Sequence, residues 1–373
     1  MNKLNMEKNR KLKLLEFIFV ILIFIVVAFL INQAISNRVG ISNYFSSKFS
    51  FSGSNSSSQI VENYGNLQII DGKLCSEDGL PIQLKGLSSH GLQWFPFVRG
   101  NTLKNSINYF GIEVIRTAMY VEVFKNGDFW NGYLAQPKYM EAKADMMIQE
   151  AIDEGIYVVL SWHIHNDPMN FKEDAMKFFE RMSKKWGKYP NVIFEICNEP
   201  EGDIEWSKIK DYAIGEPDNL EDGVIDLIRK ADSDDNPNII LVGTPFWSQR
   251  VDAALEDPII EYDNIMYTLH FYASDHKEDV REQAQRALDG GLAIFVSEWG
   301  TCNYMVNGPI DFDSSNEWIE WMNKNNISWI NWALANKDEK ASLLKPSVSM
   351  KGPWGEEDLT ESGKFIKGLF ERY

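Results

Sequence analysis

The sequence predicts an α/β fold, namely a single (β/α)8 TIM barrel, and two features of the residue pattern support this. Short runs rich in β-branched residues recur along the chain, and longer amphipathic stretches lie between them, with apolar residues at i, i+3 and i+4. Apolar strands that alternate with helices are typical of a parallel sheet covered by helices, and eight such units close into a barrel. The eight runs are residues 82–87, 112–115, 157–160, 192–196, 239–242, 265–269, 293–296 and 328–330.

The N-terminal segment, residues 1–35, differs from the rest of the chain. Five basic residues within positions 3–13 precede an uninterrupted apolar run over residues 17–31, and two leucines before one glutamate extend this run. A bilayer-spanning helix needs roughly 17 to 25 residues, so the segment is predicted to be a transmembrane signal-anchor with a cytoplasmic basic flank. A cleaved signal peptide is the alternative, because its apolar region needs only about 7 to 15 residues.

The next segment, residues 36–58, is rich in Ser and Asn and lacks a sustained apolar periodicity. We therefore predict a flexible Ser-rich linker. The barrel domain is expected over residues 59–373, a length that suits this fold, which commonly takes about 250 residues or more. Whether the N-terminal segment is kept or cleaved, the domain is expected at the extracellular face of the cell membrane or in secreted form.

The composition restricts the partners of the chain. A net charge of −17 and an isoelectric point near 4.8 argue against nucleic acid, because phosphate binding needs a basic face. The twelve Trp residues suggest core anchors or flat surfaces on which sugar rings stack. Cys75, Cys197 and Cys302 have no metal-binding spacing and the His residues are not paired on one helix, so no metal or cofactor is predicted. The disulfide state of the cysteines is left open.

The predicted strands tend to end in polar or aromatic residues. In a barrel the carboxyl ends of the strands meet at one mouth, where active sites of this fold lie, so we expect a shared cavity. The alternatives are an ordinary turn at residues 198–200 and core positions for His163 and His270. The end residues are Ser88, Ser89, His90, Arg116, Trp162, His163, Asn198, Glu199, Thr244, His270, Tyr272, Glu298, Trp299, Asn331 and Trp332.

Two glutamates are expected on opposite sides of this mouth. Glu199 follows the fourth run and Glu298 the seventh, and strands three positions apart in an eight-strand ring lie across the lumen. Two opposed carboxylates are the minimum apparatus for glycoside hydrolysis, in which, at a separation of about 5 to 5.5 Å, one attacks the anomeric carbon and the other protonates the leaving oxygen. A guanidinium favours an ionised carboxylate, so Arg116, with Tyr272, assigns Glu298 as the nucleophile. Glu199 is then the acid/base, because the charge of the other carboxylate raises its pKa.

Several segments, in unbroken order over residues 66–344, resemble glycoside hydrolase family 5, in particular its bacterial endo-β-1,4-glucanases. The segments are SSHGLQW, IRTAMY, SWHI, FEICNEP, LHFY, VSEWGT and NWALANKDE. The resemblance implies a retaining, double-displacement endoglucanase of cellulose or related β-glucans, with Glu199 as acid/base and Glu298 as nucleophile. It also implies a catalytic shell, in which Asn198 binds the sugar 2-hydroxyl, and a set of sugar-binding positions. The shell is Arg116, His163, Asn198, His270 and Tyr272, and the sugar-binding positions are His90, Trp94, Tyr120, Trp332, Lys337 and Glu339.

The chain departs from the family pattern at two places, which leave the number of sugar subsites open. The segment IHNDPMN after the third run is shorter than usual, and residues 215–223 interrupt the helix expected after the fourth run. The alternatives are a mannanase or xyloglucanase on the same barrel, because fold does not determine substrate, and a non-catalytic surface glycan-binding protein. We expect a monomer that takes a β-glucan polysaccharide or oligosaccharide and contacts the membrane only through residues 1–35.

Overall fold

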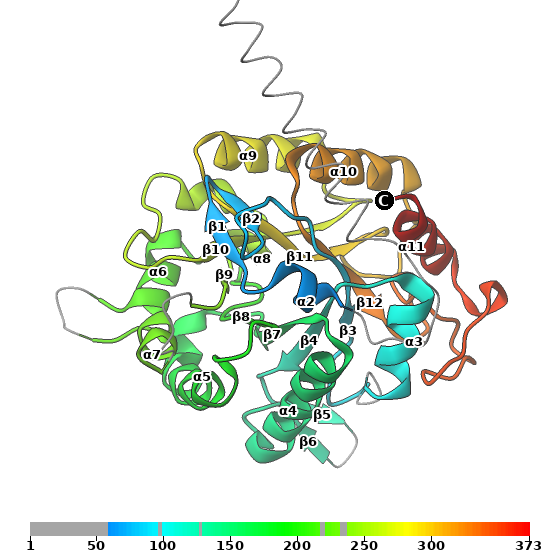
Figure 1. Cartoon of the computed structure of the whole chain (residues 1–373), viewed down its shortest axis with the longest axis horizontal. Helices are drawn as coiled ribbons and strands as arrows, with labels where there is room; N and C mark the ends of the chain where they lie inside the picture. The colour runs from blue at the N-terminus through cyan, green and yellow to red at the C-terminus, as the bar shows by residue number, and fades with distance from the viewer. Residues whose placement is uncertain (1–58, 96–98, 127–128, 217–220, 232–236) are drawn as a thin grey trace, which may run out of the picture. The chain divides into compact units, whose positions relative to one another are not determined.

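The computed structural model describes residues 59–95, 99–126, 129–216, 221–231 and 237–373, and within them the chain folds as a closed barrel of parallel strands (Figure 1). Each of the eight predicted runs overlaps one barrel strand, and neighbours in sequence are neighbours in the barrel, so the predicted (β/α)8 fold is confirmed. The strands are β3 (Lys85–Ser89), β4 (Val114–Tyr120), β7 (Tyr157–His163), β8 (Val192–Glu195), β9 (Ile240–Val242), β10 (Ile265–Tyr272), β11 (Ile294–Gly300) and β12 (Trp329–Leu334).

Several strands continue beyond the apolar runs that predicted them. β4 and β7 remain paired as far as Tyr120 and His163, and β10 pairs with β11 through His270 and Glu298. The backbone ladder does not depend on apolar side chains, so it extends into the polar residues at the carboxyl ends. Several predicted site residues therefore lie on the strands themselves, which are more rigid supports than loops.

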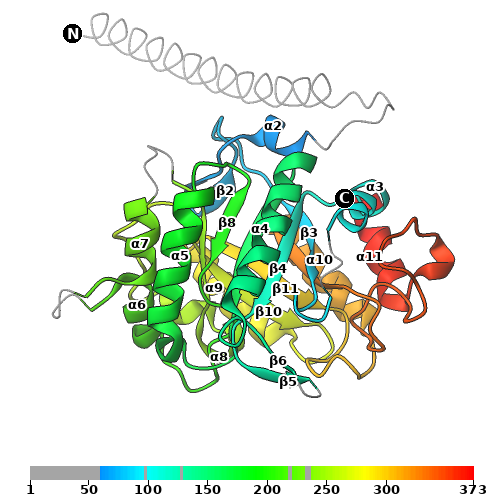
Figure 2. The same cartoon turned by 90° about the horizontal axis from the view of Figure 1, so that it is seen from below.

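Helices surround the barrel on its outside (Figures 1 and 2). The helix after β8 is divided into α6 and α7, separated by residues 215–223 as the sequence predicted; residues 217–220 lie outside the described part. The helices that follow the barrel strands are α3 (Asn101–Phe110), α4 (Pro137–Glu154), α5 (Lys172–Trp186), α6 (Trp206–Ile214), α7 (Val224–Ala231), α8 (Pro245–Ser248), α9 (Glu278–Asp289), α10 (Phe312–Asn325) and α11 (Glu361–Arg372).

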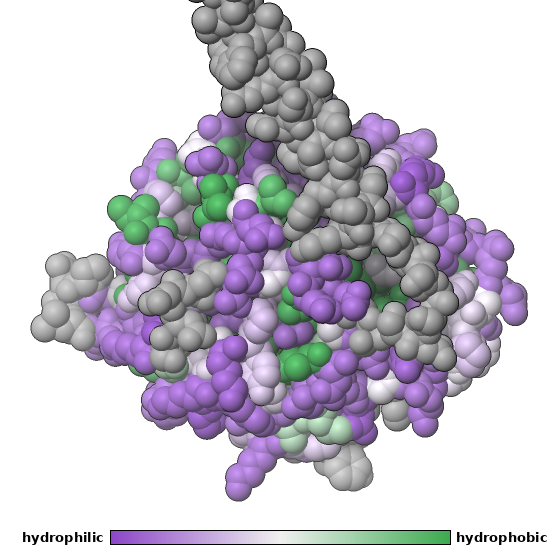
Figure 3. All heavy atoms as spheres, in the orientation of Figure 1, coloured by the Kyte–Doolittle hydropathy of each residue, from purple (hydrophilic) through white to green (hydrophobic). Residues whose placement is uncertain are grey.

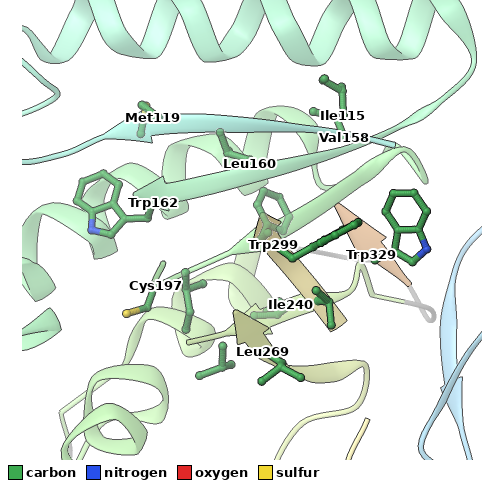
Figure 4. Packing of buried hydrophobic residues seen from close by; sticks show 14 of the residues in the cluster. Ile115, Met119, Val158, Leu160, Trp162, Cys197, Ile240, Leu269, Trp299 and Trp329 are labelled. Atoms are coloured by element: carbon green, nitrogen blue, oxygen red, sulfur yellow. The ribbon is translucent and has the colours of Figure 1, made fainter. Parts of the chain in front are cut away.

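The apolar core has two layers, one on each face of the barrel wall. The outer layer lies between strands and helices and contains Trp162, Trp299 and Trp329, which are shown in Figure 4. The inner layer fills the barrel itself with side chains such as Val159 and Phe295. Burying one large apolar side chain stabilises a fold by about 1.5 to 3 kcal/mol, so these two layers hold the strand ends in place.

A short N-terminal unit closes the end of the barrel opposite to the mouth. It consists of α2 (Ile60–Tyr64) and the hairpin of β1 (Gln68–Ile70) and β2 (Lys73–Cys75), and Leu67 and Leu74 pack on the inner core layer. Figure 2 shows this unit at the far end from the hairpin of β5 (Phe124–Asn126) and β6 (Phe129–Asn131). On the face seen in Figure 3, most described residues are hydrophilic.

Two further expectations concern the N-terminal segment and the cysteines. The predicted membrane span and the linker, residues 1–58, lie outside the described residues. Within the described part of the chain, no helix combines the length and the apolar character that a membrane crossing needs. Cys75, Cys197 and Cys302 are all buried free thiols, which answers the question that the sequence left open.

Hydrogen bonds tie the closing unit to the barrel wall. The Tyr157 hydroxyl donates to the carbonyl of Gly65 at 2.7 Å, and Tyr64 hydrogen-bonds Glu113 just before β4. Glu113 also accepts from the backbone N–H of Lys85 at 3.0 Å. Burial raises the pKa of Glu113 to about 7, against the opposing attraction of the Lys85 ammonium. The folded protein therefore favours the protonated form of Glu113.

We predict that Glu113→Gln removes a pH dependence of stability. Because the folded-state pKa is raised, the contribution of protonated Glu113 is full below pH about 4.5 and is lost as the pH rises through about 7. The side chain keeps some solvent contact, so we expect the variant to gain about 1 to 2 kcal/mol relative to the parent between pH 5 and 8. Urea unfolding across this pH range measures the difference, and a constant difference would contradict the prediction.

Candidate active site

The two predicted glutamates meet at the carboxyl end of the barrel. Glu298 lies on β11, and Glu199 follows β8 in the loop that begins after Glu195. One carboxylate oxygen from each and one ring nitrogen of His270 all lie within 4.8 Å of one another. A separation of about 5 Å between carboxyl groups suits direct attack by one of them, whereas about 6.5 to 9.5 Å would leave room for an intervening water.

Arg116 on β4 connects the residues around these glutamates. Its side chain is fully buried, and it donates to Glu298 at 2.8 Å, to Glu195 at 2.8 Å and to the side-chain oxygen of Asn198 at 2.5 Å. The guanidinium thus joins residues of β8, the loop after β8, and β11. Its planar set of donors suits this arrangement, because several acceptors can be held at defined angles.

Glu298 has a second direct donor. The Tyr272 hydroxyl, at the end of β10, donates to Glu298 Oε1 at 2.9 Å, while Arg116 occupies Oε2. Glu199 instead contacts one ring nitrogen of His270 at 2.9 Å, and the other ring nitrogen of His270 lies 2.8 Å from the Ser297 hydroxyl. Two donors, one of them permanently charged, therefore favour the ionised form at Glu298.

The titration of the pair depends on these contacts. Burial and the charge of Glu199 raise the pKa of Glu298, against the attraction of Arg116. At Glu199 burial is the largest influence and raises the pKa, but the hydrogen bond to His270 and the nearby positive charges together outweigh it and lower the pKa. The Arg116 guanidinium that contacts Glu298 is charged at every accessible pH, so its attraction for the ionised form of Glu298 is permanent.

The predicted sugar-binding residues form a polar group on one side of the mouth. The N–H of Gly91 donates to His90 Nδ1 at 2.8 Å, and burial with the nearby Lys337 ammonium lowers the pKa of His90 to about 3. The ring is therefore neutral, and its Nε2 lies 3.8 Å from Glu339. Lys337 Nζ lies 2.6 Å from Glu339, whose side chain is only 4% exposed. Oε2 of Glu339 faces this ammonium, whereas Oε1 completes no hydrogen bond in the described structure and can accept from a sugar hydroxyl.

Aromatic rings border the same part of the mouth. His163 lies between Tyr120 and Trp332, with ring centroids 4.3 and 5.5 Å away, and Trp94 packs edge-on against Tyr120 at 5.1 Å. Burial and the charge of Arg116 hold the pKa of His163 well below its usual range, so the ring is neutral. The His90 ring lies 5.1 Å from that of Trp332, which joins the polar group to the aromatic rings. The structure therefore brings all thirteen predicted site residues together around one mouth.

The cleft continues beyond Trp94 into a hollow of about 470 Å³. It lies between the segment after β3 and the segment after β12, and is lined by Trp94, Phe95, Asn336, Ser349, Met350 and Lys351. The volume falls within the roughly 300 to 1,000 Å³ typical of small-molecule sites. This hollow was not among the sequence predictions, because it depends on how two distant loops approach each other.

Two residues that support the site were not predicted from the sequence. Glu195 lies within the apolar run of β8, is fully buried and contacts Arg116 NH2 at 2.7 Å. A charged residue inside an otherwise apolar strand was the available signal, because such a charge needs a partner. Ser297 has no comparable signal, since a small hydroxyl residue in a strand is common. Its role as a partner of His270 follows only from the structure.

Glu199, His270 and Glu298 are also the described residues whose spacing could hold a metal ion. One oxygen of Glu298 already faces the Arg116 guanidinium, which repels a cation. The expected lack of a metal remains a prediction.

The protein has a (β/α)8 barrel whose mouth holds two carboxylates at this separation. These two features place it in the class of barrel proteins with a glycosidase-type site. Comparison with known proteins narrows this class. Residues 75–338 match the family model described as cellulase, glycosyl hydrolase family 5. The chain belongs to glycosyl hydrolase family 5.

Relatives with assigned names are similar over most of this chain. An endoglucanase of Clostridium saccharobutylicum is 44% identical over 81% of this chain and 64% of its own length. Endoglucanase A of Evansella cellulosilytica is 43% identical over 78% of this chain and 56% of its own length. The chain therefore spans less than two thirds of these two relatives.

Solved structures agree with the fold. A protein from Cytophaga hutchinsonii superposes with a TM-score of 0.77 at 38% identity, over 84% of this chain and 97% of that one. The catalytic domain of Thermobifida fusca endoglucanase Cel5A superposes with a TM-score of 0.75 at 30% identity, over 84% of this chain and all of that domain.

We predict that Tyr272→Phe moves the acidic limb of the pH profile. Loss of the hydroxyl removes one donor to ionised Glu298, which raises the pKa of this carboxyl further. Activity that needs ionised Glu298 should then disappear at a higher pH than in the parent. The measurement is kcat/KM against pH on a chromogenic cellobioside, with Tyr304→Phe, an exposed phenol, as the control. A uniform loss of rate with an unchanged limb would contradict the prediction.

Proposed function

We propose that the protein is a retaining endo-β-1,4-glucanase that cleaves internal bonds of cellulose or related β-glucans. The observation that carries the proposal is the pair of carboxylates within 4.8 Å, one of which is bound by Arg116 and Tyr272. Relatives named endoglucanase, at 44% and 43% identity, support the substrate class. A variant of the Thermobifida fusca enzyme solved with cellotetraose supports a β-glucan chain as the ligand.

The proposed reaction has two steps. In the first, Glu298 attacks the anomeric carbon while Glu199 donates its proton to the leaving oxygen, which gives a covalent glycosyl-enzyme. In the second, Glu199 removes a proton from water, which attacks the same carbon and releases Glu298, so the anomeric configuration is retained. Arg116 and Tyr272 hold Glu298 in the ionised form that attack requires, and His270 orients Glu199.

Other residues bind the sugar in this proposal. Asn198 lies beside Glu199, its side-chain oxygen accepts from Arg116, and its NH2 group donates one hydrogen to the carbonyl of Ile164 at 3.2 Å, so its second N–H is available for the substrate 2-hydroxyl. That contact strengthens as charge develops at the transition state. The carboxylate of Glu339, whose Oε2 is ion-paired with Lys337, and the neutral Nε2–H of His90 are suited to hydroxyl groups of a second sugar. Trp332 and Trp94 provide flat apolar faces for sugar rings.

A panel of four polysaccharides tests the substrate class. We expect hydrolysis of carboxymethyl-cellulose and mixed-linkage glucan, with an early fall in viscosity because internal bonds are cut. Initial rates on mannan and xyloglucan should be lower, and Glu298→Ala provides the background. Activity on mannan or xyloglucan without activity on the first two would favour the alternatives on the same barrel. No activity on any of the four would favour a glycan-binding protein.

The roles of the two glutamates can be separated by rescue. Glu298→Ala should abolish turnover, and azide should restore it with an inverted product, because a small anion can attack from the side that the nucleophile vacates. Glu199→Ala should keep the first step for activated leaving groups, which need no proton. Product anomers are assigned by NMR. Rescue of Glu199→Ala with an inverted product would reverse the assignment.

We further propose that the domain acts outside the cell membrane, held by residues 1–35 or released after cleavage. This rests on the basic and apolar pattern of the sequence alone. Sequencing the N-terminus of the native protein shows whether residues 1–35 are retained. A soluble extracellular form that begins between residues 35 and 59 would contradict the anchor, once proteolysis of the linker is excluded.

A further inference from the structure

The turn after β9 has an uncommon backbone. Three consecutive residues have left-handed conformations: Phe246 (φ 60, ψ 57), Trp247 (φ 54, ψ 46) and Ser248 (φ 58). Gly, Asn and Asp adopt this region readily, whereas bulky residues rarely do. α8 is therefore a single left-handed turn built from unsuitable residue types. Strain of this kind persists only where the surroundings hold it, and it gathers at functional sites.

Hydrogen bonds from this turn end on the backbone around Glu199. The N–H of Trp247 donates to the carbonyl of Pro200 at 2.8 Å, and the Ser248 hydroxyl donates to the carbonyl of Asn198 at 2.6 Å. The left-handed conformation is what places this N–H and this hydroxyl on the same neighbouring segment. The carbonyl groups of the residues before and after Glu199 are thus both held from one turn.

Ser248 is the centre of this arrangement. Its side chain is fully buried, and its oxygen accepts from the Thr268 hydroxyl at 3.0 Å and from the N–H of Thr244 at 3.3 Å. Because the hydroxyl also donates to the Asn198 carbonyl, it makes one hydrogen bond as donor and two as acceptor, which is all that a hydroxyl group can make. Its orientation is therefore determined by neighbours on β10 and on the segment after β9.

Two glycines allow the turn to approach so closely. A Cβ at Gly202 would lie 2.8 Å from the ring of Trp247, and a Cβ at Gly243 would lie 2.6 Å from the carbonyl oxygen of Cys197. The N–H of Glu199 itself donates to the carbonyl of Ile164 at 3.1 Å. The backbone that carries Glu199 is consequently held on both sides, by the loop after β7 and by the left-handed turn after β9.

We propose that the left-handed turn positions the acid/base, with Ser248 as a positioning residue that acts through the Asn198 carbonyl. The proposal rests on the proposed function for the role of Glu199. Without the Ser248 hydroxyl, the Asn198 carbonyl loses its donor and the peptide before Glu199 can rotate. The carboxyl group would then leave the position from which it contacts His270 and protonates the leaving oxygen. Glu298 is held separately by Arg116 and Tyr272 and should keep its place.

The test compares leaving groups in Ser248→Ala. For phenyl β-cellobioside, whose departure needs a proton, we expect kcat/KM to fall about 10- to 100-fold. For 2,4-dinitrophenyl β-cellobioside, which leaves without one, we expect a change of at most about threefold. kcat/KM is used because it reports the first chemical step. Ser248→Gly, which relieves the left-handed strain but also lacks the hydroxyl, should behave like Ser248→Ala.

The matched control is Ser106→Ala. Ser106 is also fully buried and donates to a backbone carbonyl at 2.7 Å, but on α3. It should leave both rates unchanged. Equal losses on both cellobiosides, or a loss on neither, would overturn the positioning role. A Ser248→Ala variant with a lowered melting temperature is judged by the same ratio between the two substrates, since general destabilisation affects both equally.

A second measurement does not need turnover. The imidazole ¹⁵N shifts of His270 report its contact with Glu199, and they should change in Ser248→Ala and stay unchanged in Ser106→Ala. Unchanged shifts in both would overturn the positioning role. If the parent protein hydrolyses neither cellobioside, the proposed function fails, while these shifts still decide whether Ser248 positions Glu199.

Discussion

The buried guanidinium of Arg116 is the interaction on which the mouth of the barrel depends. It joins Glu195, Asn198 and Glu298, which come from different parts of the barrel wall, and it is excluded from solvent. Removing one partner of a buried ion pair typically costs about 3 to 5 kcal/mol, because a charge is left without compensation. The same contacts hold Glu298 and the residue before Glu199, so the group that stabilises the barrel wall also positions the two predicted catalytic carboxylates.

The residues around Arg116 differ in their charge. Burial keeps His163 and His90 neutral, so the strong positive charge near the glutamates is that of Arg116. Glu339, a predicted sugar-binding residue whose side chain is also buried, has the Lys337 ammonium beside it. The large net negative charge of the whole chain therefore does not reflect the local charge at the mouth of the barrel. There, each buried carboxylate near Arg116 faces a cation, a phenol or an imidazole.

The sequence predicted those features of the fold and the site that a single strand or helix determines. Apolar runs located all eight strands, and polar residues after them identified the site, because strand ends of a barrel must meet. The sequence did not predict the features that depend on contacts between distant segments. Glu195 stood out as a charge inside an apolar run, but the sequence could not identify its partner, which lies 79 positions away. The segment from Thr244 to Ser248 contains no Gly or Asn to signal a left-handed turn, and the unit that closes the barrel was not predicted because its strands are only three residues long.

The three cysteines give the fold an independence from redox conditions. All are buried, and burial raises the pKa of each thiol, to about 12 for Cys302. The thiolate is the form that reacts with oxidants and disulfides, so these side chains are chemically quiet. The described barrel holds no disulfide, so it offers no cross-link that an oxidant must form or that a reductant could open. Its covalent connectivity is therefore the same in a reducing and in an oxidising environment.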